Sequence, residues 1–142
     1  MRILGLDVGT KRIGLAVSDE LLFTAQGMET VYRRELAQDL DELKKIIEEN
    51  NAEEIVVGFP LNMNGTAGPK AKEILEFIEN LSKVIKVPVK TWDERLTTVQ
   101  AERALLEADM SRAKRKRLVD KLAAQLILQG YLDSRKKGQI SG

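Results

Sequence analysis

The first third of the chain shows blocks of apolar residues that predict β-strands. Residues 2–8 form an apolar run interrupted by one acid, which is typical of a buried strand. After a turn at residues 9–12, residues 13–19 predict a second strand that pairs with the first as a hairpin. A weaker third strand is expected between Phe23 and Tyr32. Because short connections join these three strands, we expect them to be antiparallel neighbours.

The spacing of apolar residues changes to a helical period near residue 34. Four apolar residues recur at i, i+4, i+7 and i+11 among charges, which predicts an amphipathic helix over about residues 34–50. These residues are Leu36, Leu40, Leu43 and Ile47. The other predicted elements are a strand at 54–59, a helix ending at about Val84, a strand at 87–92, and helices at 97–108 and about 114–134.

The order of these elements, three strands followed by alternating helices and strands, indicates an α/β fold. The fourth and fifth strands each follow a helix, so they should run parallel to the first strand with right-handed connections. We therefore predict a five-stranded mixed sheet in the order 3-2-1-4-5, flanked by helices. No repeat or linker suggests a second domain, and we expect a single domain at residues 1–136 with a flexible tail at 137–142.

The composition narrows the possible chemistry, because the chain contains no cysteine and no histidine. Disulfides, thiolate metal sites, imidazole-bound zinc and nucleophiles activated by histidine are therefore excluded. Hydrolytic chemistry would have to use carboxylates, lysines, hydroxyls or a cation bound by oxygen. No segment reaches the ~18–20 apolar residues of a membrane span, and no signal peptide is expected. We therefore predict a cytoplasmic protein without membrane contact.

Acidic residues lie at the carboxyl ends of two of the strands that we predict to be parallel. Asp7 lies late in the first strand, and Glu94 comes just after the fifth, next to Asp93. Ligands of open α/β sheets bind at the carboxyl ends of the parallel strands, so these acids should meet at one edge. Asp120 can join them, since it shares one ridge of the last, largely apolar helix with Tyr131. We predict Asp7, Glu94 and Asp120 as the catalytic carboxylates.

Three such acids fit a divalent metal site. Mg²⁺ and Mn²⁺ prefer carboxylate oxygens, and one or two such ions held by these three residues would support phosphodiester hydrolysis. Each acid also has a purely structural interpretation. Asp7 could cap the turn that follows it, Glu94 could belong to a solvated charge cluster, and Asp120 could pair with a basic residue of its own helix. Their expected convergence favours the metal site.

The most concentrated charge in the chain is at residues 112–117, where five of six residues are basic. Cations at the start of a helix oppose its dipole, so this run indicates an anionic partner such as a phosphate backbone. We predict nucleic acid as the partner. Most of the few aromatic residues are expected in the core, so we expect backbone recognition and no base-stacking platform. The predicted contacts are Lys11, Arg12, Asn62, Asn64, Arg95, Arg112, Lys114, Arg115, Lys116 and Arg117.

Four stretches of the chain resemble the signature sequences of the YqgF/RuvX family. In the family's order, they are GLDVGTKRIGLAVSD (5–19), GFPLNMNGT (58–66), DERLTT (93–98) and DKLAAQLILQGYL (120–132). The resemblance implies a ribonuclease H-like fold and a nuclease that matures the 5′ end of the 16S ribosomal RNA precursor, with Holliday junction resolution as the alternative. The family's acidic positions fall on Asp7, Glu94 and Asp120. Its loop usually carries aspartate where this chain has Asn64.

Two other classes of protein remain open. The hairpin at residues 7–17 also resembles the phosphate loop of the actin and sugar-kinase superfamily, although those proteins use two such lobes and no P-loop is present here. A module that binds RNA without cutting it is the second. Among nucleases, a resolvase needs paired active sites and hence a dimer. No uncommitted apolar stripe is visible in the sequence, so we favour a monomer. The family resemblance leads us to prefer a ribosomal RNA precursor over branched DNA.

Overall fold

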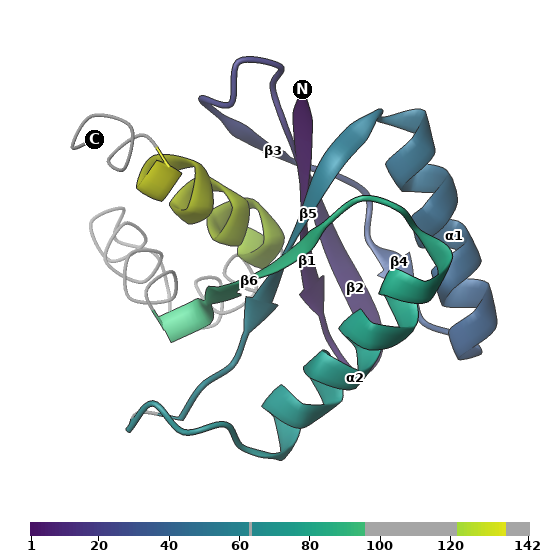
Figure 1. The fold of residues 1–142 in the computed structure, drawn as a ribbon, viewed down its shortest axis with the longest axis vertical. Coiled ribbons are helices and arrows are strands. Elements are labelled where there is room, and N and C mark those ends of the chain that lie inside the picture. Colours follow the sequence, from purple (N-terminus) through teal and green to yellow (C-terminus); the bar gives the residue numbers. More distant parts are fainter. Residues whose placement is uncertain (63, 96–121, 136–142) are drawn as a thin grey trace, which may run out of the picture.

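The computed structural model describes residues 1–62, 64–95 and 122–135, arranged as Figure 1 shows. Its strands are β1 (Arg2–Val8), β2 (Arg12–Ser18), β3 (Ala25–Gly27), β4 (Val31–Tyr32), β5 (Ala52–Phe59) and β6 (Val89–Asp93). Its helices are α1 (Leu36–Glu49), α2 (Pro69–Val84) and residues 122–135, here called the C-terminal helix. The predicted helix at 97–108, the start of that at 114–134 and the predicted tail at 137–142 lie outside the described residues.

The strands form one mixed sheet with β1 near its middle. They follow the order β3-β2-β1-β5-β6, and β4 also pairs with β2. β1 runs antiparallel to β2 and parallel to β5, and β5 runs parallel to β6. The connections that lead into β5 and β6 contain α1 and α2, as parallel strands require. The carboxyl ends of β1, β5 and β6 therefore lie at one edge of the sheet.

The prediction of five strands was wrong by one, because the predicted third strand forms two short strands. β3 pairs with residues 16–18 of β2, and β4 pairs with residues 12–13. Between the two pairings, residues 28–30 face only residues 14–15, so one extra residue interrupts the ladder. An insertion of this kind, a β-bulge, bends the strand and ends its regular pairing. The apolar pattern of a segment does not show such an insertion.

The two faces of the sheet carry separate hydrophobic cores. One core lies between the sheet and the helices α1 and α2, and it includes Leu4, Leu6 and Val8 of β1. Successive strand residues point to opposite faces, so Ile3 and Asp7 of β1 lie on the other side. There Ile3 packs in a second core with the C-terminal helix. We call this side the Asp7 face, and Figure 1 shows the C-terminal helix across the sheet from α1 and α2.

Local signals explain where α1 and α2 begin. Glu35 N donates a hydrogen bond to Gln38 Oε1 (3.2 Å), and Asp39 lies in the first turn of α1, where a negative charge is favourable to the helix dipole. α2 begins at Pro69, which lacks the N–H group that a first turn would leave unpaired. Each helix turns its apolar stripe toward the core. The buried apolar residues are Leu40, Leu43 and Ile47 of α1 and Ala71, Ile74, Phe77 and Leu81 of α2.

The C-terminal helix packs directly on the sheet. A Cβ atom added at Gly5 would lie 2.8 Å from Leu128 Cβ, so glycine is needed for this close approach. Two side chains of the helix also continue the hydrogen bonding of β3. Ala25 N donates to Gln129 Oε1 (3.0 Å), and Gln125 Nε2 donates to Ala25 O (3.0 Å). The position of the helix on the Asp7 face is therefore set by specific contacts.

Buried Glu54 of β5 anchors the far end of the same helix. Its carboxylate accepts hydrogen bonds from Tyr131 Oη (2.9 Å) and Arg135 Nη1 (2.9 Å). Lys90 of β6 places its Nζ 2.6 Å from Glu54 Oε1. The ring of Tyr131 also meets the ring of Trp92 edge-on, with 6.3 Å between centroids. Glu54 therefore links the C-terminal helix to β5 and β6, and the positive charges of Lys90 and Arg135 balance its negative charge.

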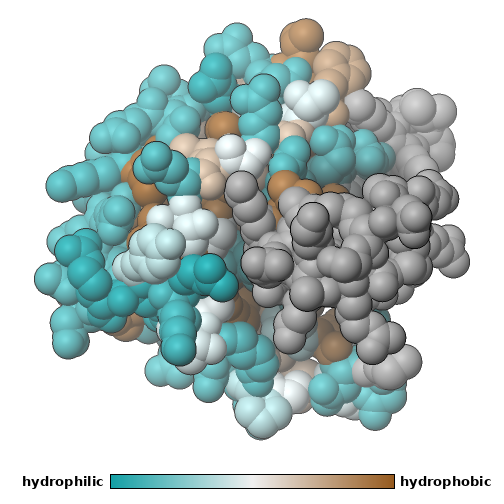
Figure 2. Space-filling view, turned by 180° about the vertical axis from the view of Figure 1, so that it is seen from behind, coloured by the Kyte–Doolittle hydropathy of each residue, from teal (hydrophilic) through white to brown (hydrophobic). Residues whose placement is uncertain are grey.

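The surface of the described residues is mainly polar on the side seen in Figure 2. Hydrophilic residues dominate this view, and the apolar atoms form small, separate patches between them. Among the described residues, none of the helices has the length and apolar character to cross a membrane.

Candidate active site

Asp7 lies at the carboxyl end of the central strand. Its Cα pairs with that of Gly14 in the ladder between β1 and β2, and the residue is half-buried on the Asp7 face. The turn that follows is closed by a backbone hydrogen bond from Gly9 N to Arg12 O (2.8 Å). A backbone hydrogen bond thus closes the turn that follows Asp7.

Glu94 reaches the same place from the other side of β5. It follows β6 directly, and Gly58 of β5 pairs with Trp92, two residues before Glu94. A Cβ atom added at Gly58 would lie 2.5 Å from Glu94 Oε1 and 2.5 Å from Ile127 Cδ1. Glycine leaves room here for the carboxylate and for Ile127, and a larger residue would force both side chains to shift.

Asp7 and Glu94 meet through a hydrogen bond between their side chains. Two carboxyl groups can share such a bond only when one of them holds a proton. The pKa of Glu94 is raised to about 7, first by burial and then by the charge and the hydrogen bond of Asp7. Lys70 in the first turn of α2 has the opposite effect, because its positive charge lowers the pKa of Glu94. The structure thus places Asp7 of β1 in contact with Glu94, the residue that follows β6.

Arg95, which we predicted to contact nucleic acid, is engaged by the protein itself. Its Nε and Nη2 atoms donate to the Asp93 carboxylate at 3.0 Å and 2.7 Å. Its Nη1 atom donates to Asn62 O (3.2 Å). The guanidinium group lowers the pKa of Asp93 through these contacts. Arg95 therefore joins the end of β6 to the loop that follows β5, beside the acid pair.

The loop after β5 is closed by its own side chains. Asn62 Nδ2 donates to Thr66 Oγ1 (3.1 Å), and Asn64 Oδ1 accepts hydrogen bonds from Thr66 N (3.1 Å) and Thr66 Oγ1 (2.6 Å). Gly65 has a φ of 84°, a conformation that favours glycine. The predicted nucleic-acid contacts Asn62 and Asn64 thus shape the loop in this structure. An aspartate at position 64 could accept the same two hydrogen bonds.

The other predicted site residues fall into two groups. Lys11 and Arg12 are exposed in the turn after Asp7. The third predicted carboxylate and the basic run lie outside the described residues; these are Asp120, Arg112, Lys114, Arg115, Lys116 and Arg117. Within residues 1–62, 64–95 and 122–135, no group of three acidic side chains is placed to hold a metal ion.

Sequence reasoning missed two residues at this edge, Gly58 and Lys70. Gly58 stands late in a strand, where glycine often marks the close approach of another group, so a usable signal was present. Lys70 carries no such signal, because it is one of many lysines in the chain. Lys70 lowers the pKa of Glu94 only because the tertiary structure brings the first turn of α2 near that residue.

Solved structures define the class of fold. RuvC of T. thermophilus, in complex with a Holliday junction substrate, matches with a TM-score of 0.60 over 96% of this chain and 96% of that chain, at 16% identity. The fowlpox virus Holliday junction resolvase matches with a TM-score of 0.54 over 94% of this chain and 99% of that chain, at 15% identity. The chain therefore has the predicted ribonuclease H-like fold, which it shares with these resolvase structures.

Within this fold class, the chain belongs to the RuvX family. The model of that family, described as "Holliday junction resolvase", matches residues 1–134. A relative from Clostridium novyi (strain NT), named "Putative pre-16S rRNA nuclease", is 60% identical over 134 residues, covering 94% of this chain and 99% of the relative. A relative of the same name from Desulforamulus reducens is 55% identical over 137 residues, covering 96% and 100%. The family resemblance of the four sequence stretches is confirmed.

Proposed function

We propose that this chain is a metal-dependent nuclease that hydrolyses phosphodiester bonds with Asp7, Glu94 and Asp120 as its catalytic carboxylates. The observation that carries the proposal is the direct contact of Asp7 with Glu94 at the carboxyl edge of the sheet. Paired acids that raise a pKa in this way concentrate at functional sites. Ligands of open α/β sheets also bind at this edge.

The residues present fit a hard divalent cation. Asp7 and Glu94 offer carboxylate oxygens in an environment with excess negative charge, as the raised pKa of Glu94 indicates. They would hold one or two Mg²⁺ or Mn²⁺ ions, with Asp120 as a further ligand. When bound, such ions activate water and stabilise the leaving oxygen. Glu94 must release the proton that it shares with Asp7 before both carboxylates can act as ligands. The charge of Lys70 favours this release.

Exposed cations beside the acid pair support nucleic acid as the substrate. Lys11 and Arg12 follow Asp7 in the same turn, and we assign to them the binding of phosphate groups. We assign the same role to the basic run at 112–117. Curated relatives are named for the 16S ribosomal RNA precursor. We infer that its 5′-end maturation in the cytoplasm is the reaction, and that a monomer is sufficient for it.

Holliday junction resolution is the second candidate function. It is favoured by the description of the RuvX family and by the resolvases that share the fold. A resolvase cuts two strands and needs two active sites, hence a dimer. Light scattering in the presence and absence of a four-way junction separates the two functions. A monomer that cuts the RNA precursor supports maturation, and a dimer that cuts only the junction supports resolution.

The test is cleavage of a labelled RNA precursor and of a four-way DNA junction with Mg²⁺ or Mn²⁺. We expect Asp7→Asn and Glu94→Gln each to lower the rate at least about 10²-fold, because each removes a charged ligand. Asp41→Asn, in an exposed position of α1, is the matched control and should retain activity. Cleavage that survives Asp7→Asn would remove the proposed site. Binding without cleavage in either metal would instead indicate an RNA-binding module.

A further inference from the structure

Arg12 and Tyr32 stand side by side at the edge of the sheet that carries Asp7. They are direct partners in the ladder between β2 and β4. Directly opposed residues of antiparallel strands present their side chains to one face, about 4.5–5.5 Å apart at Cβ. Their neighbours Ile13 and Val31 are buried against α1 and α2, so Arg12 and Tyr32 must point to the Asp7 face. Tyr32 is 70% exposed, which is unusual for an aromatic side chain at a strand position.

This pair is aligned with the acid pair. Asp7 faces Gly14 across the ladder, and Arg12 lies two residues before Gly14 in β2. Diagonal neighbours on adjacent antiparallel strands are about 7–8 Å apart. Across the carboxyl end of β1, the order on one face is therefore Tyr32, Arg12, Asp7 and then Glu94. A nucleic-acid strand with its scissile phosphate at the acids would pass over Arg12 and Tyr32.

Arg12 also differs electrostatically from the other described arginines. Arg33, Arg34, Arg95 and Arg135 each form an ion pair at 3.4 Å or less, and Arg2 lies 4.0 Å from Glu20. Among the described residues, Arg12 is the arginine without an ion pair. Its positive charge is thus available to an anion from outside the protein.

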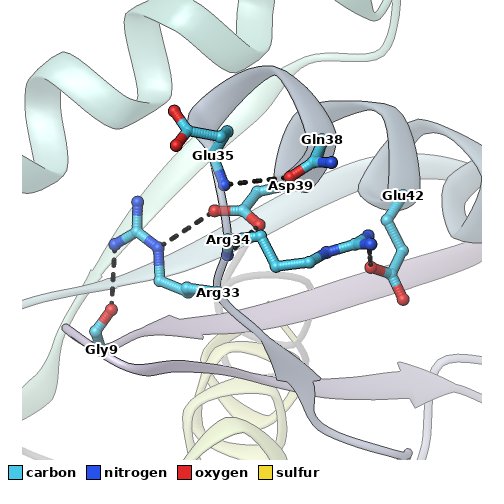
Figure 3. A network of polar contacts seen from close by, with 7 residues as sticks. All are labelled: Gly9, Arg33, Arg34, Glu35, Gln38, Asp39 and Glu42. Carbon is cyan, nitrogen blue, oxygen red and sulfur yellow. Dashed lines mark hydrogen bonds and ion pairs between the residues drawn. The ribbon is translucent and has the colours of Figure 1, made fainter.

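The turn that carries Arg12 is held in place by a buried acid. Asp39, which is fully buried, accepts a hydrogen bond from Arg33 Nε (3.4 Å) and one from Arg34 N (2.9 Å). Arg33 in turn donates from Nη1 to Gly9 O (3.0 Å), as Figure 3 shows. Arg33 N also donates to Lys11 O (2.9 Å). These bonds fix the backbone on both sides of the turn, so Arg12 is presented from a rigid support.

We propose that Arg12 and Tyr32 form a subsite for an unpaired nucleotide next to the cleaved bond. Arg12 binds the phosphate of that nucleotide, and the ring of Tyr32 stacks on its base. Stacking on an aromatic ring tolerates any base, whereas a duplex keeps its bases stacked on each other and out of reach. The proposal rests on the nuclease function above, since it assumes a nucleic-acid strand at the acid pair. It differs from the sequence-based expectation of backbone recognition alone.

The experiment measures binding without cleavage. All variants carry Asp7→Asn, and fluorescence anisotropy records their affinity for a labelled single-stranded RNA and for a blunt duplex. We expect Tyr32→Ala to weaken single-strand binding about 5- to 140-fold and to leave duplex binding within about twofold. Tyr32→Phe retains the ring and should bind like the parent. Because Tyr32 is exposed, both variants should fold, which circular dichroism verifies.

Arg12 is tested by the salt dependence of the same binding. The affinity falls as the salt concentration rises. Arg12→Ala should make the plot of log affinity against log salt less steep by about 0.7, the value for one phosphate contact on a single strand. Arg34→Ala is the matched control, because Arg34 is already paired with Glu42 and should leave the slope unchanged.

The outcomes separate this proposal from the proposed function. Unchanged single-strand affinity in Tyr32→Ala overturns the subsite, as does an equal loss in Tyr32→Ala and Tyr32→Phe or an equal loss on the duplex. An unchanged salt slope in Arg12→Ala overturns the role of Arg12. If the chain with Asp7 intact binds these strands through Tyr32 but never cuts nucleic acid, the subsite stands and the nuclease function fails. If it binds no nucleic acid at all, both fail.

Discussion

The two ends of the Asp7 face hold glutamates in opposite electrostatic situations. At the amino end of β5, buried Glu54 is surrounded by Lys90, Tyr131 and Arg135, all of which donate to it at 2.9 Å or less. At the carboxyl end, half-buried Glu94 faces another acid, Asp7, and its pKa rises to about 7. Glu54 likewise raises the pKa of Lys90, mainly through their hydrogen bond.

This difference matches the structural role of Glu54 and the catalytic role that we propose for Glu94. A buried acid with a full set of donors stabilises the contact that it makes, because its charge is compensated. An acid that faces another acid costs free energy in the folded state, and perturbed acids of this kind concentrate at functional sites. The same sheet face therefore anchors the C-terminal helix at one end and carries the proposed active site at the other.

The largest expected effect comes from Asp7→Asn. Cleavage should fall at least about 10²-fold, as argued above, while the free energy of unfolding stays equal to or above that of the unchanged protein. Stability should not fall because the substitution removes a like charge from Glu94. Urea unfolding at pH 8 without added metal measures this. Lower stability in Asp7→Asn would show that Asp7 has the same structural role as Glu54.

The reverse pattern is expected for Glu54→Ala. We expect it to lower the free energy of unfolding by about 2–3 kcal/mol, since the donors Lys90, Tyr131 and Arg135 lose their common acceptor, although they partly remain in contact with water. Glu53→Ala, at the exposed neighbouring position, is the matched control and should change stability by less than about 0.5 kcal/mol. Equal effects of the two substitutions in urea unfolding would contradict an anchoring role of Glu54.

Gly58→Ala tests the support of the acid pair. The added methyl group would lie 2.5 Å from Glu94 Oε1 and Ile127 Cδ1, so we expect a loss of about 1–3 kcal/mol in stability together with reduced cleavage. Gly27→Ala is the control, because the nearest atom to its added methyl group is Gln125 Oε1 at an ordinary 3.5 Å. If Gly58→Ala keeps full activity, Glu94 does not depend on this close approach.

The smallest expected effect is the pH dependence of stability in the metal-free protein. The pKa of Glu94 is raised from 4.5 to about 7, so between these values the folded chain keeps a proton that the unfolded chain has lost. Stability therefore falls as the pH rises through this window, by an amount on the order of 1–2 kcal/mol, since Glu94 is partly exposed. Glu94→Gln cannot titrate and should show a flatter profile. If urea unfolding gives the same dependence of stability on pH for Glu94→Gln and for the unchanged protein, the raised pKa of Glu94 is contradicted.

The fold was largely predictable because its signals are local. The period of the apolar residues predicted β1, β2, α1, β5, α2 and β6, and the element order indicated which strands run parallel. The split of the third predicted strand into β3 and β4 was not predictable, because one extra residue at 28–30 changes the pairing but not the apolar pattern. A strand pattern reports which face is buried and says nothing of a partner's register.

The candidate site was predictable in part. The position of Asp7 and Glu94 after parallel strands indicated that they would meet, because strand direction alone brings these ends together. The engagement of Arg95 by Asp93 and Asn62 was not visible, because any exposed arginine offers the same charge in the sequence. The exposure of Tyr32 was equally hidden, since aromatic residues in a strand are more often core.

The amino-acid sequence by itself thus determined the elements, their directions and the edge at which the acids gather, since period and chain order carry that information. Three-dimensional packing alone settled that the charges of Glu54, Arg33 and Arg95 are compensated, that Glu94 lies against a second acid, and that Arg12 has no ion pair among the described residues. The physical reason is that charge compensation acts over a few ångströms between residues that are distant in the chain.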